Sequence, residues 1–204
     1  MPRKPCGECV TNVACLGYAA LFPLHSFASV TMTTITIASD ATAILVTVIV
    51  TVVLHLKMFC NALMTGHYRF AAGGRPPEDQ KLKPGIPKQD FHGAAASSSA
   101  QDDSVKAAKA SLDRHLRILA NDNENVLPGL FVVWASALTI GTRDWAATFH
   151  IVCAAVFGFS RVAHSLCYAY SKQPWRTVFW ALAFVAAVAM GVNAIIGAVE
   201  YTKL

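Results

Sequence analysis

Long apolar runs separated by polar segments dominate the pattern of the chain. Three of them, 41–65, 145–170 and 175–199, are long enough to cross a hydrocarbon core as helices, which takes roughly 20 residues each. A shorter run ending at Ile140 reaches that length if the polar residues 121–125 form its first helical turn. The pattern predicts an all-α membrane protein with four transmembrane helices in a domain of residues 40–204. The expected spans are 41–65, 121–140, 145–170 and 175–199.

Composition and charge support this interpretation and add an orientation. The chain of 204 residues is 54% hydrophobic and 14% charged, and its mean hydropathy is +0.44, which is high for a water-soluble domain. Nine Lys or Arg residues lie from Arg69 to Arg117, and Lys172 and Arg176 lie in the third loop. The positive-inside rule places both loops in the cytosol. The net charge of +5 is therefore a topology signal, and we expect no nucleic-acid partner because no aromatic platform accompanies it.

Two segments fall outside the predicted helices. In the extension 1–39, Arg3 and Lys4 precede an apolar stretch and then small residues, an order typical of a signal peptide; a transit peptide or a plain extension are the alternatives. The segment 70–110 is rich in Gly, Pro, Ala, Ser and Lys, so we expect a flexible cytosolic loop. From Ser104 to Leu119 the composition favours a helix that extends the second span.

The six cysteines are scattered and form no disulfide framework. Cys6 and Cys9 have the spacing of a metal or redox pair, but no second pair follows them. We therefore predict no metal site.

The second span begins with the densest polar cluster of the chain. At helical spacing Arg117, Asn121 and Glu124 are i, i+4 and i+7, so one face carries a guanidinium, an amide and a carboxylate. Polar groups at a membrane entry are costly unless they are used. This face is suited to a small zwitterionic ligand.

Two other spans carry polar side chains. The third holds the stripe Arg161, His164, Ser165 and Tyr168, and we expect Arg161 to pair with Glu124 and Asp122 of the second span. The first holds Lys57 and Asn61 on one face, and we expect Lys57 to pair with a carboxylate of a neighbouring helix.

Cations gather at the cytosolic rim, where Arg69, Arg117 and Arg176 are expected beside Glu124. Arginine recognises carboxylates in bidentate fashion, so the rim indicates a ligand with more than one carboxylate and an ammonium. A guanidinium also favours a thiolate. Because no protein cysteine is expected at this rim, the thiol would come from the ligand.

These residues carry a resemblance to the MAPEG family, membrane-associated proteins of eicosanoid and glutathione metabolism. The branch it resembles is that of microsomal glutathione transferase 1 and microsomal prostaglandin E synthase 1. The matching pieces occur in the family order and are Leu56 to Phe59, Thr65 to Arg69, Pro77 to Asp79, Arg117 to Glu124 with Pro128, Arg161 to Tyr168, and Pro174 to Arg176.

The resemblance implies a four-helix protomer, a homotrimer, and glutathione as co-substrate bound between protomers near the cytosolic face. It implies an integral membrane protein of the endoplasmic reticulum; the mitochondrial outer membrane or another organelle are alternatives. Arg176 would face the thiolate, which attacks a lipophilic electrophile or lipid peroxide arriving from the membrane lipid. The other residues implied to contact glutathione are Arg69, Arg117, Asn121, Glu124, His164, Tyr168 and Trp180.

Departures from the family pattern bear on the reaction. Ala120 stands where the prostaglandin synthase has an Arg, and is nearer to the transferase. Thr177 keeps a hydroxyl that the synthase supplies from a Ser, whereas Trp180 replaces a Tyr. Asp79 and Thr177 are the further catalytic candidates that would support an isomerase. The turn before Arg176 is one residue shorter than in both relatives.

Four interpretations follow from these residues. We expect a glutathione transferase that acts on lipophilic electrophiles, with glutathione-dependent peroxidase activity as a possible addition. A prostaglandin E synthase-type isomerase is the alternative enzyme, and a non-catalytic lipid-binding adaptor is the alternative of another class. A tetraspanning protein whose polar groups only hold helices together is the remaining one.

Overall fold

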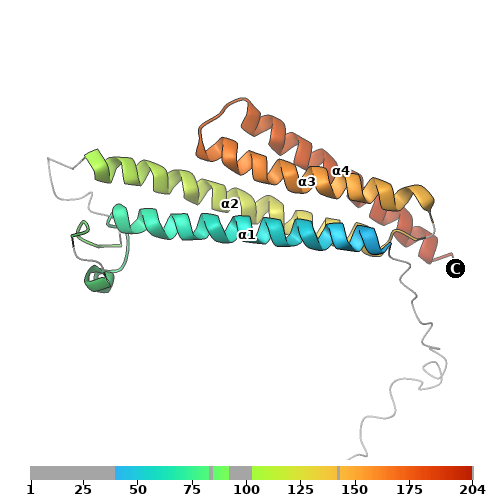
Figure 1. Cartoon of the computed structure of the whole chain (residues 1–204), viewed down its shortest axis with the longest axis horizontal. Helices are drawn as coiled ribbons and strands as arrows, with labels where there is room; N and C mark the ends of the chain where they lie inside the picture. Colours follow the sequence, from blue (N-terminus) through green and yellow to red (C-terminus); the bar gives the residue numbers. More distant parts are fainter. Residues whose placement is uncertain (1–39, 83–84, 92–102, 142, 204) are drawn as a thin grey trace, which may run out of the picture. The chain divides into compact units, whose positions relative to one another are not determined.

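The computed structural model describes residues 40–82, 85–91, 103–141 and 143–203. The predicted signal peptide, the pair Cys6 and Cys9, and residues 92–102 of the predicted loop lie outside these residues. Four long helices make up most of the described chain (Figure 1). They are α1 (Ala41–Ala71), α2 (Asp103–Leu138), α3 (Asp144–Ala169) and α4 (Trp175–Tyr201).

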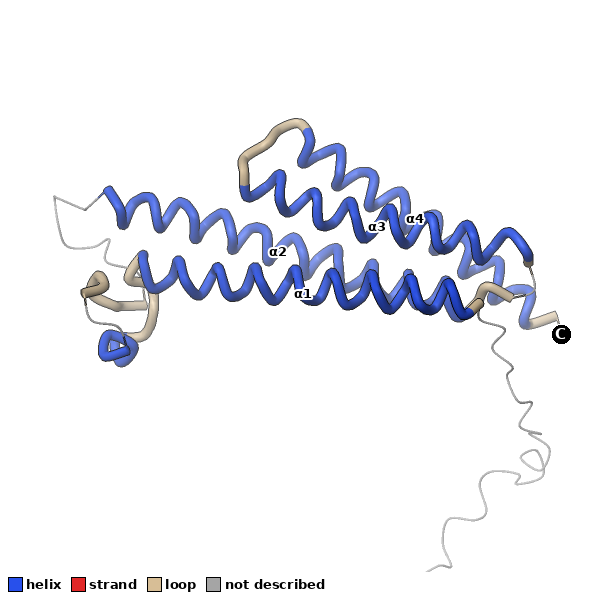
Figure 2. Tube along the Cα trace, in the orientation of Figure 1, coloured by secondary structure: helices blue, strands red, loops and turns tan. Residues whose placement is uncertain are grey.

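The described helices pack as an antiparallel bundle. α1 contacts α2 and α3, α4 contacts α2 and α3, and α2 also contacts α3 across the diagonal. Helices dominate the tube view, in which loops are confined to the ends of the bundle (Figure 2). α1 and α2 lie side by side and continue beyond the turn that joins α3 to α4 (Figure 1).

Local signals explain where α1 and the bundle core form. Asp40 caps α1 by accepting hydrogen bonds from the backbone N–H groups of Thr42 at 2.7 Å and Ala43 at 3.2 Å. The core fills with residues from all four helices, among them Leu54, Val126, Phe157 and Met190. Apolar side chains elsewhere on the helices face outward, which is expected for helices that contact lipid.

Three of the described helices are long and apolar enough to cross a membrane: α1, α3 from Trp145 and α4. The described residues thus form the all-helical fold of an integral membrane protein. α2 lacks such a window, since its apolar part begins only after the polar residues 121–125. Membrane crossing by 121–140, and with it the fourth span, stays a prediction.

The described part of the segment expected as a flexible loop, 70–110, has defined structure. Pro77–Leu82 forms a short 3-10 helix, η2. Gln89, 2% exposed, donates hydrogen bonds to the carbonyls of Phe70 at 3.0 Å and Pro87 at 2.8 Å and thereby ties the loop to the end of α1. α2 already begins at Asp103. The flexibility of the segment 70–110 as a whole stays a prediction.

Candidate functional site

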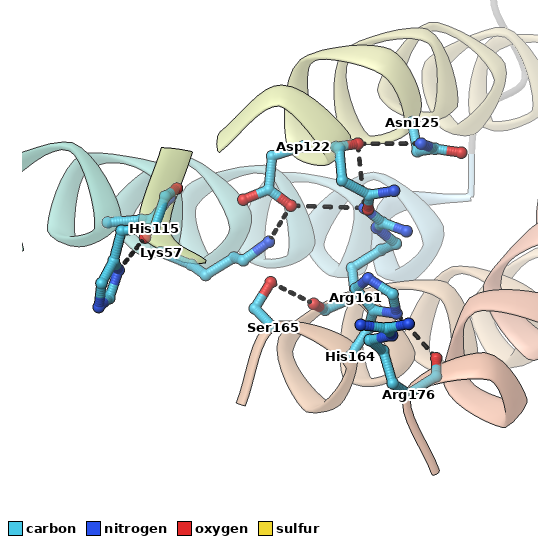
Figure 3. A network of polar contacts seen from close by, with 10 residues as sticks. Lys57, His115, Asp122, Asn125, Arg161, His164, Ser165 and Arg176 are labelled. Carbon is cyan, nitrogen blue, oxygen red and sulfur yellow. Dashed lines mark hydrogen bonds and ion pairs between the residues drawn. The ribbon is translucent and has the colours of Figure 1, made fainter. Parts of the chain in front are cut away.

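A buried ionic cluster joins α1, α2 and α3 (Figure 3). Arg161 of α3 donates from its terminal nitrogen to the side-chain oxygen of Asn121 at 2.7 Å and reaches Asp122 Oδ1 at 3.4 Å. Lys57 of α1 pairs with the same Asp122 oxygen. Asp122 is fully buried and Arg161 is 1% exposed. One carboxylate therefore holds two cations inside the bundle, where unpaired charge would be costly.

This cluster confirms one expected partner of Arg161 and corrects the other. Asp122 pairs with it, but Glu124 is exposed and makes no ion pair with Arg161 in the described chain. Residues two apart on a helix point in nearly opposite directions, so Asp122 and Glu124 cannot face the same neighbour. The expected pairing of Lys57 with a carboxylate of another helix is confirmed.

Arg161 also determines how the side-chain amide of Asn121 is oriented. Because the amide oxygen of Asn121 accepts from Arg161, its NH2 group is left to donate elsewhere. Asn121 lines a cavity beside the cluster. The arrangement thus offers an amide donor, suited to a carboxylate or carbonyl, on the cavity side of α2.

Two residues of α3 hold Arg176 at the start of α4. The Nδ1 atom of His164 donates to the backbone carbonyl of Arg176 at 2.9 Å, since a carbonyl can only accept. The guanidinium carbon of Arg176 lies 4.6 Å from the centre of the Tyr168 ring. Main chain and side chain of Arg176 are therefore both fixed on α3, and the short turn does not carry it away from Tyr168.

Three cavities follow one another along α2, α3 and α4. The cationic cavity, about 340 Å³, lies between α2 and the α3–α4 turn, and its lining includes Arg114, Arg117, Cys167, Tyr168, Lys172 and Arg176. The middle cavity, about 230 Å³, is lined by Asn121, His164, Tyr168, Arg176, Thr177 and Trp180.

The third, the apolar cavity, has about 330 Å³ and lies between α2 and α4 over Phe157. Tyr168 and Arg176 line both the cationic and the middle cavity. Trp180 lines both the middle and the apolar cavity. The series therefore passes from a charged cavity to an apolar one, with Arg176 lining the first two cavities and Trp180 the last two.

Seven of the residues expected at a site line the cationic or the middle cavity. They are Arg117, Asn121, His164, Tyr168, Arg176, Thr177 and Trp180. Their roles toward a ligand stay predictions.

Three expected site residues lie elsewhere in this chain. Arg69 lines a separate cavity of about 580 Å³ between the end of α1 and α2. Asp79 pairs with Arg75 at 3.2 Å within the α1–α2 connection. Glu124 lines the apolar cavity, which Arg161 also lines.

The sequence interpretation missed seven residues of the cationic cavity, which are Ala110, Asp113, Arg114, Cys167, Ser171, Lys172 and Gln173. Arg114 is three residues before Arg117 and so on the same face of α2, a signal that was available. Lys172 lies in the α3–α4 turn, where no helical spacing predicts which way its side chain points. The free thiol of Cys167 also lines this cavity, which corrects the expectation of a rim without a protein cysteine.

A second network of buried hydrogen bonds crosses the bundle away from these cavities. The ring of His150 is hydrogen-bonded to Thr47 at 2.8 Å and to Ser136 at 3.0 Å, and Asn193 donates to Ser136 at 3.0 Å. The four residues come from four different helices and are almost fully buried. These four polar side chains therefore bond the helices to one another at that end of the bundle.

A model of the MAPEG family matches residues 47–196. The matched range includes every residue of the cationic, middle and apolar cavities and most of all four helices. A search among curated proteins finds no match to this chain.

Proposed function

The chain belongs to the MAPEG family, and from this premise we propose that it is a membrane-bound glutathione transferase that conjugates glutathione to lipophilic electrophiles. Family membership supports a glutathione-related transferase or isomerase function in a membrane. The transferase branch, and glutathione itself as the ligand, belong to the proposal.

The observation that carries the proposal is the position of Arg176. It lines both the cationic and the middle cavity and lies over the ring of Tyr168. Glutathione has two carboxylates, one ammonium and a thiol. Arg114, Arg117 and Lys172 supply cations for the carboxylates on one side of Arg176. On its other side, the NH2 group of Asn121 and the hydroxyl of Thr177 supply hydrogen-bond donors.

The chemistry assigned to Arg176 is electrostatic. A guanidinium beside the glutathione sulfur favours the thiolate, so the pKa of that thiol falls and its proton passes to water. The thiolate attacks the electrophilic carbon, a carbon–sulfur bond forms, and the leaving group departs with the bonding electron pair. With a lipid hydroperoxide the thiolate would instead attack the terminal peroxide oxygen, so that a sulfur–oxygen bond forms, the oxygen–oxygen bond breaks and the alkoxide leaves and is protonated to the alcohol. A second glutathione would attack the sulfur of the resulting sulfenic acid, which gives the disulfide and water.

The apolar cavity supports a lipophilic second substrate. It adjoins the middle cavity through Trp180 and is otherwise lined mostly by apolar side chains, such as Val132, Phe184 and Val188. An apolar group placed there is shielded from water while its reactive end lies toward Arg176. Trp180 thus lies where the two substrates would meet.

A homotrimer would complete the site. Arg69, Asp79 and Glu124 do not line the cavities that contain Arg176 in this chain, and a neighbouring protomer could supply them. We place the site at the cytosolic face, most simply in the endoplasmic reticulum, because the connection after α1 and the α3–α4 turn carry the excess of Lys and Arg.

A prostaglandin E synthase-type isomerase is the second candidate. Thr177 lines the middle cavity with Arg176, which favours it. Against it, Asp79 is paired with Arg75. A lipid-binding adaptor without catalysis would use the apolar cavity alone and would not need the cations around Arg176.

Conjugation by the purified full-length protein tests the proposal. Wild type, Arg176→Ala and the control Arg143→Ala are assayed with glutathione and chlorodinitrobenzene. Arg143 is an arginine at the far end of the bundle, paired with Glu200 at 2.9 Å. Conjugation should fall about 100-fold or more in Arg176→Ala, the scale of losing one electrostatic stabiliser, and persist in Arg143→Ala. A wild type without conjugation or glutathione binding excludes the transferase, and product analysis with a prostaglandin endoperoxide separates the isomerase.

A further inference from the structure

The cytosolic part of α2 projects beyond the buried ionic cluster. From Asp122 to Arg117 is five residues, about 7.5 Å along a helix, and Arg117 forms no hydrogen bond or ion pair with another described residue. Its guanidinium nevertheless lines the cationic cavity. Something on α2 must fix the rotation of the helix at this level, because a turn about its axis would carry Arg117 out of the cavity.

His115 makes a two-point contact with α1 at that level, which we call the His115–Asn61 clasp. Its Nδ1 atom donates to the side-chain oxygen of Asn61 at 2.6 Å, and its backbone carbonyl accepts from the Asn61 amide at 3.3 Å. Asn61 is 8% exposed. Both polar ends of one amide are thus used by one residue of the neighbouring helix.

Tyr68 closes the clasp from the side. Its ring stacks on the His115 ring with 5.1 Å between ring centres and 25° between planes. Burial lowers the pKa of His115, and the neighbouring Arg114 lowers that pKa further. The ring is therefore held neutral, with its proton on Nδ1 where the Asn61 oxygen requires it.

A second side of α2 is tied to α3. Arg114 donates to the carbonyl of Ala169, at the end of α3, at 3.0 Å. His115 and Arg114 are about 100° apart around the helix, so their two contacts restrain rotation as well as distance. Arg117 lies on the Arg114 side, near the cavity, while the clasp holds the α1 side.

We propose that His115 is a positioning residue that holds Arg117 in the cationic cavity through the His115–Asn61 clasp. The inference rests on the proposed function, because glutathione is the ligand whose carboxylate Arg117 would meet. His115 itself lines none of the three cavities. Its loss should therefore weaken glutathione binding and leave the rate at saturating glutathione nearly unchanged.

Substitution of His115 offers a matched pair of variants. The Nδ2 group of an asparagine occupies about the place of Nδ1 and can donate to Asn61, whereas a glutamine places its donor near Nε2. We expect His115→Ala and His115→Gln to raise the KM and Kd for glutathione about threefold to tenfold, the worth of one net hydrogen bond. His115→Asn should restore values close to wild type. His55→Ala, an exposed histidine of α1, should change neither constant.

Asn61 supplies the second test. Asn61→Ala should match His115→Ala, and the double variant should be no worse than either single one, because each removes the same contact. Equal losses in His115→Asn and His115→Gln, additive losses in the double variant, or a fall in kcat with unchanged KM would each overturn the proposal and leave His115 with a purely structural role.

Hydrogen exchange separates this proposal from the proposed function. The backbone of residues 114–120 should exchange faster in His115→Ala than in wild type and His115→Asn, with or without glutathione. Unchanged exchange in His115→Ala contradicts the clasp. A wild type that binds no glutathione while exchange responds as expected contradicts the proposed function and Arg117's role in it, and leaves the clasp as a restraint on α2.

Discussion

The guanidinium of Arg176 lies over the ring of Tyr168, with 4.6 Å between the guanidinium carbon and the ring centre. The ring offers a negatively polarised face to the cation, and the side-chain oxygen of Gln173 accepts from the Nε and terminal nitrogens at the edge of the guanidinium. The contact therefore orients Arg176 without neutralising it, which a carboxylate partner would do.

Replacement of Tyr168 tests this orienting contact. Tyr168→Phe keeps the aromatic face, so conjugation should stay within about twofold of wild type. Tyr168→Leu removes the ring and should lower kcat/KM about threefold to fivefold beyond Tyr168→Phe, the scale of a cation–π contact. Conjugation kinetics on both variants measure the difference. Equal kinetics in the two variants would show that the ring does not hold Arg176.

Cys167 can report occupancy of the cationic cavity. Its thiol lines this cavity, while Cys60 lies exposed on α1. In single-cysteine variants, labelling of Cys167 by N-ethylmaleimide should slow about tenfold when a glutathione thioether is present at ten times its Kd. Labelling of Cys60 should not respond. Mass spectrometry of the labelled peptides gives both rates, and an unprotected Cys167 would place glutathione outside the cavity.

The neutral ring of His115 predicts how stability depends on pH. Burial, and then Arg114, lower its pKa below the unfolded value of about 6.5. As pH falls below that unfolded value, the unfolded chain binds a proton before the folded chain does. The free energy of unfolding should therefore fall, until the folded pKa is reached.

The matched variant for this prediction is His115→Asn, which keeps the hydrogen bond but cannot titrate. Thermal unfolding of wild type and His115→Asn at about pH 7.5 and about pH 5.5 measures the effect. Wild type should lose more stability than the variant on acidification. A larger loss in His115→Asn would mean that the ring is stabilised by its charge.

Two glycines at the apolar cavity should respond differently to alanine. A Cβ on Gly129 would meet a ring carbon of Phe157 at 2.3 Å, whereas a Cβ on Gly191 would have Val132 as its nearest neighbour at 3.7 Å. Gly129→Ala should destabilise the bundle by about 1–3 kcal/mol through overpacking. Gly191→Ala should be neutral or slightly stabilising, since alanine favours the helix.

Thermal unfolding in detergent compares these two variants. Phe157→Leu should relieve part of the cost of Gly129→Ala, because it removes the ring carbon that the new methyl meets. Equal stability of Gly129→Ala and Gly191→Ala would contradict the close packing of Gly129 of α2 against Phe157 of α3.

Hydropathy predicted α1, α3 and α4, because each of these helices is apolar along most of its length, whereas the first half of α2 was predicted from its helix-favouring composition. Helical spacing also predicted that Lys57 would find a carboxylate. Helical spacing could not show whether Asp122 or Glu124 pairs with Arg161, because the choice of partner depends on which side of α2 faces α3. Packing around Phe157 and Gly129 sets that rotation, and it turns Asp122 inward and Glu124 outward.

The remaining site residues depend on register between helices. His115 and Asn61 are 54 positions apart, and nothing in their own surroundings in the sequence pairs them. Cys167 and Lys172 enter the cationic cavity because the α3–α4 turn folds back toward α2. Arg69 and Asp79 remain apart from Arg176 in one chain, so their part in a site depends on an assembly that sequence periodicity does not describe.

The most direct test is the ultraviolet difference spectrum of glutathione bound to the protein at neutral pH. A guanidinium at the sulfur should produce a thiolate band in wild type that disappears in Arg176→Ala, while equilibrium dialysis shows that this variant still binds glutathione. A thiolate band that survives in Arg176→Ala with glutathione bound would contradict the role assigned to Arg176.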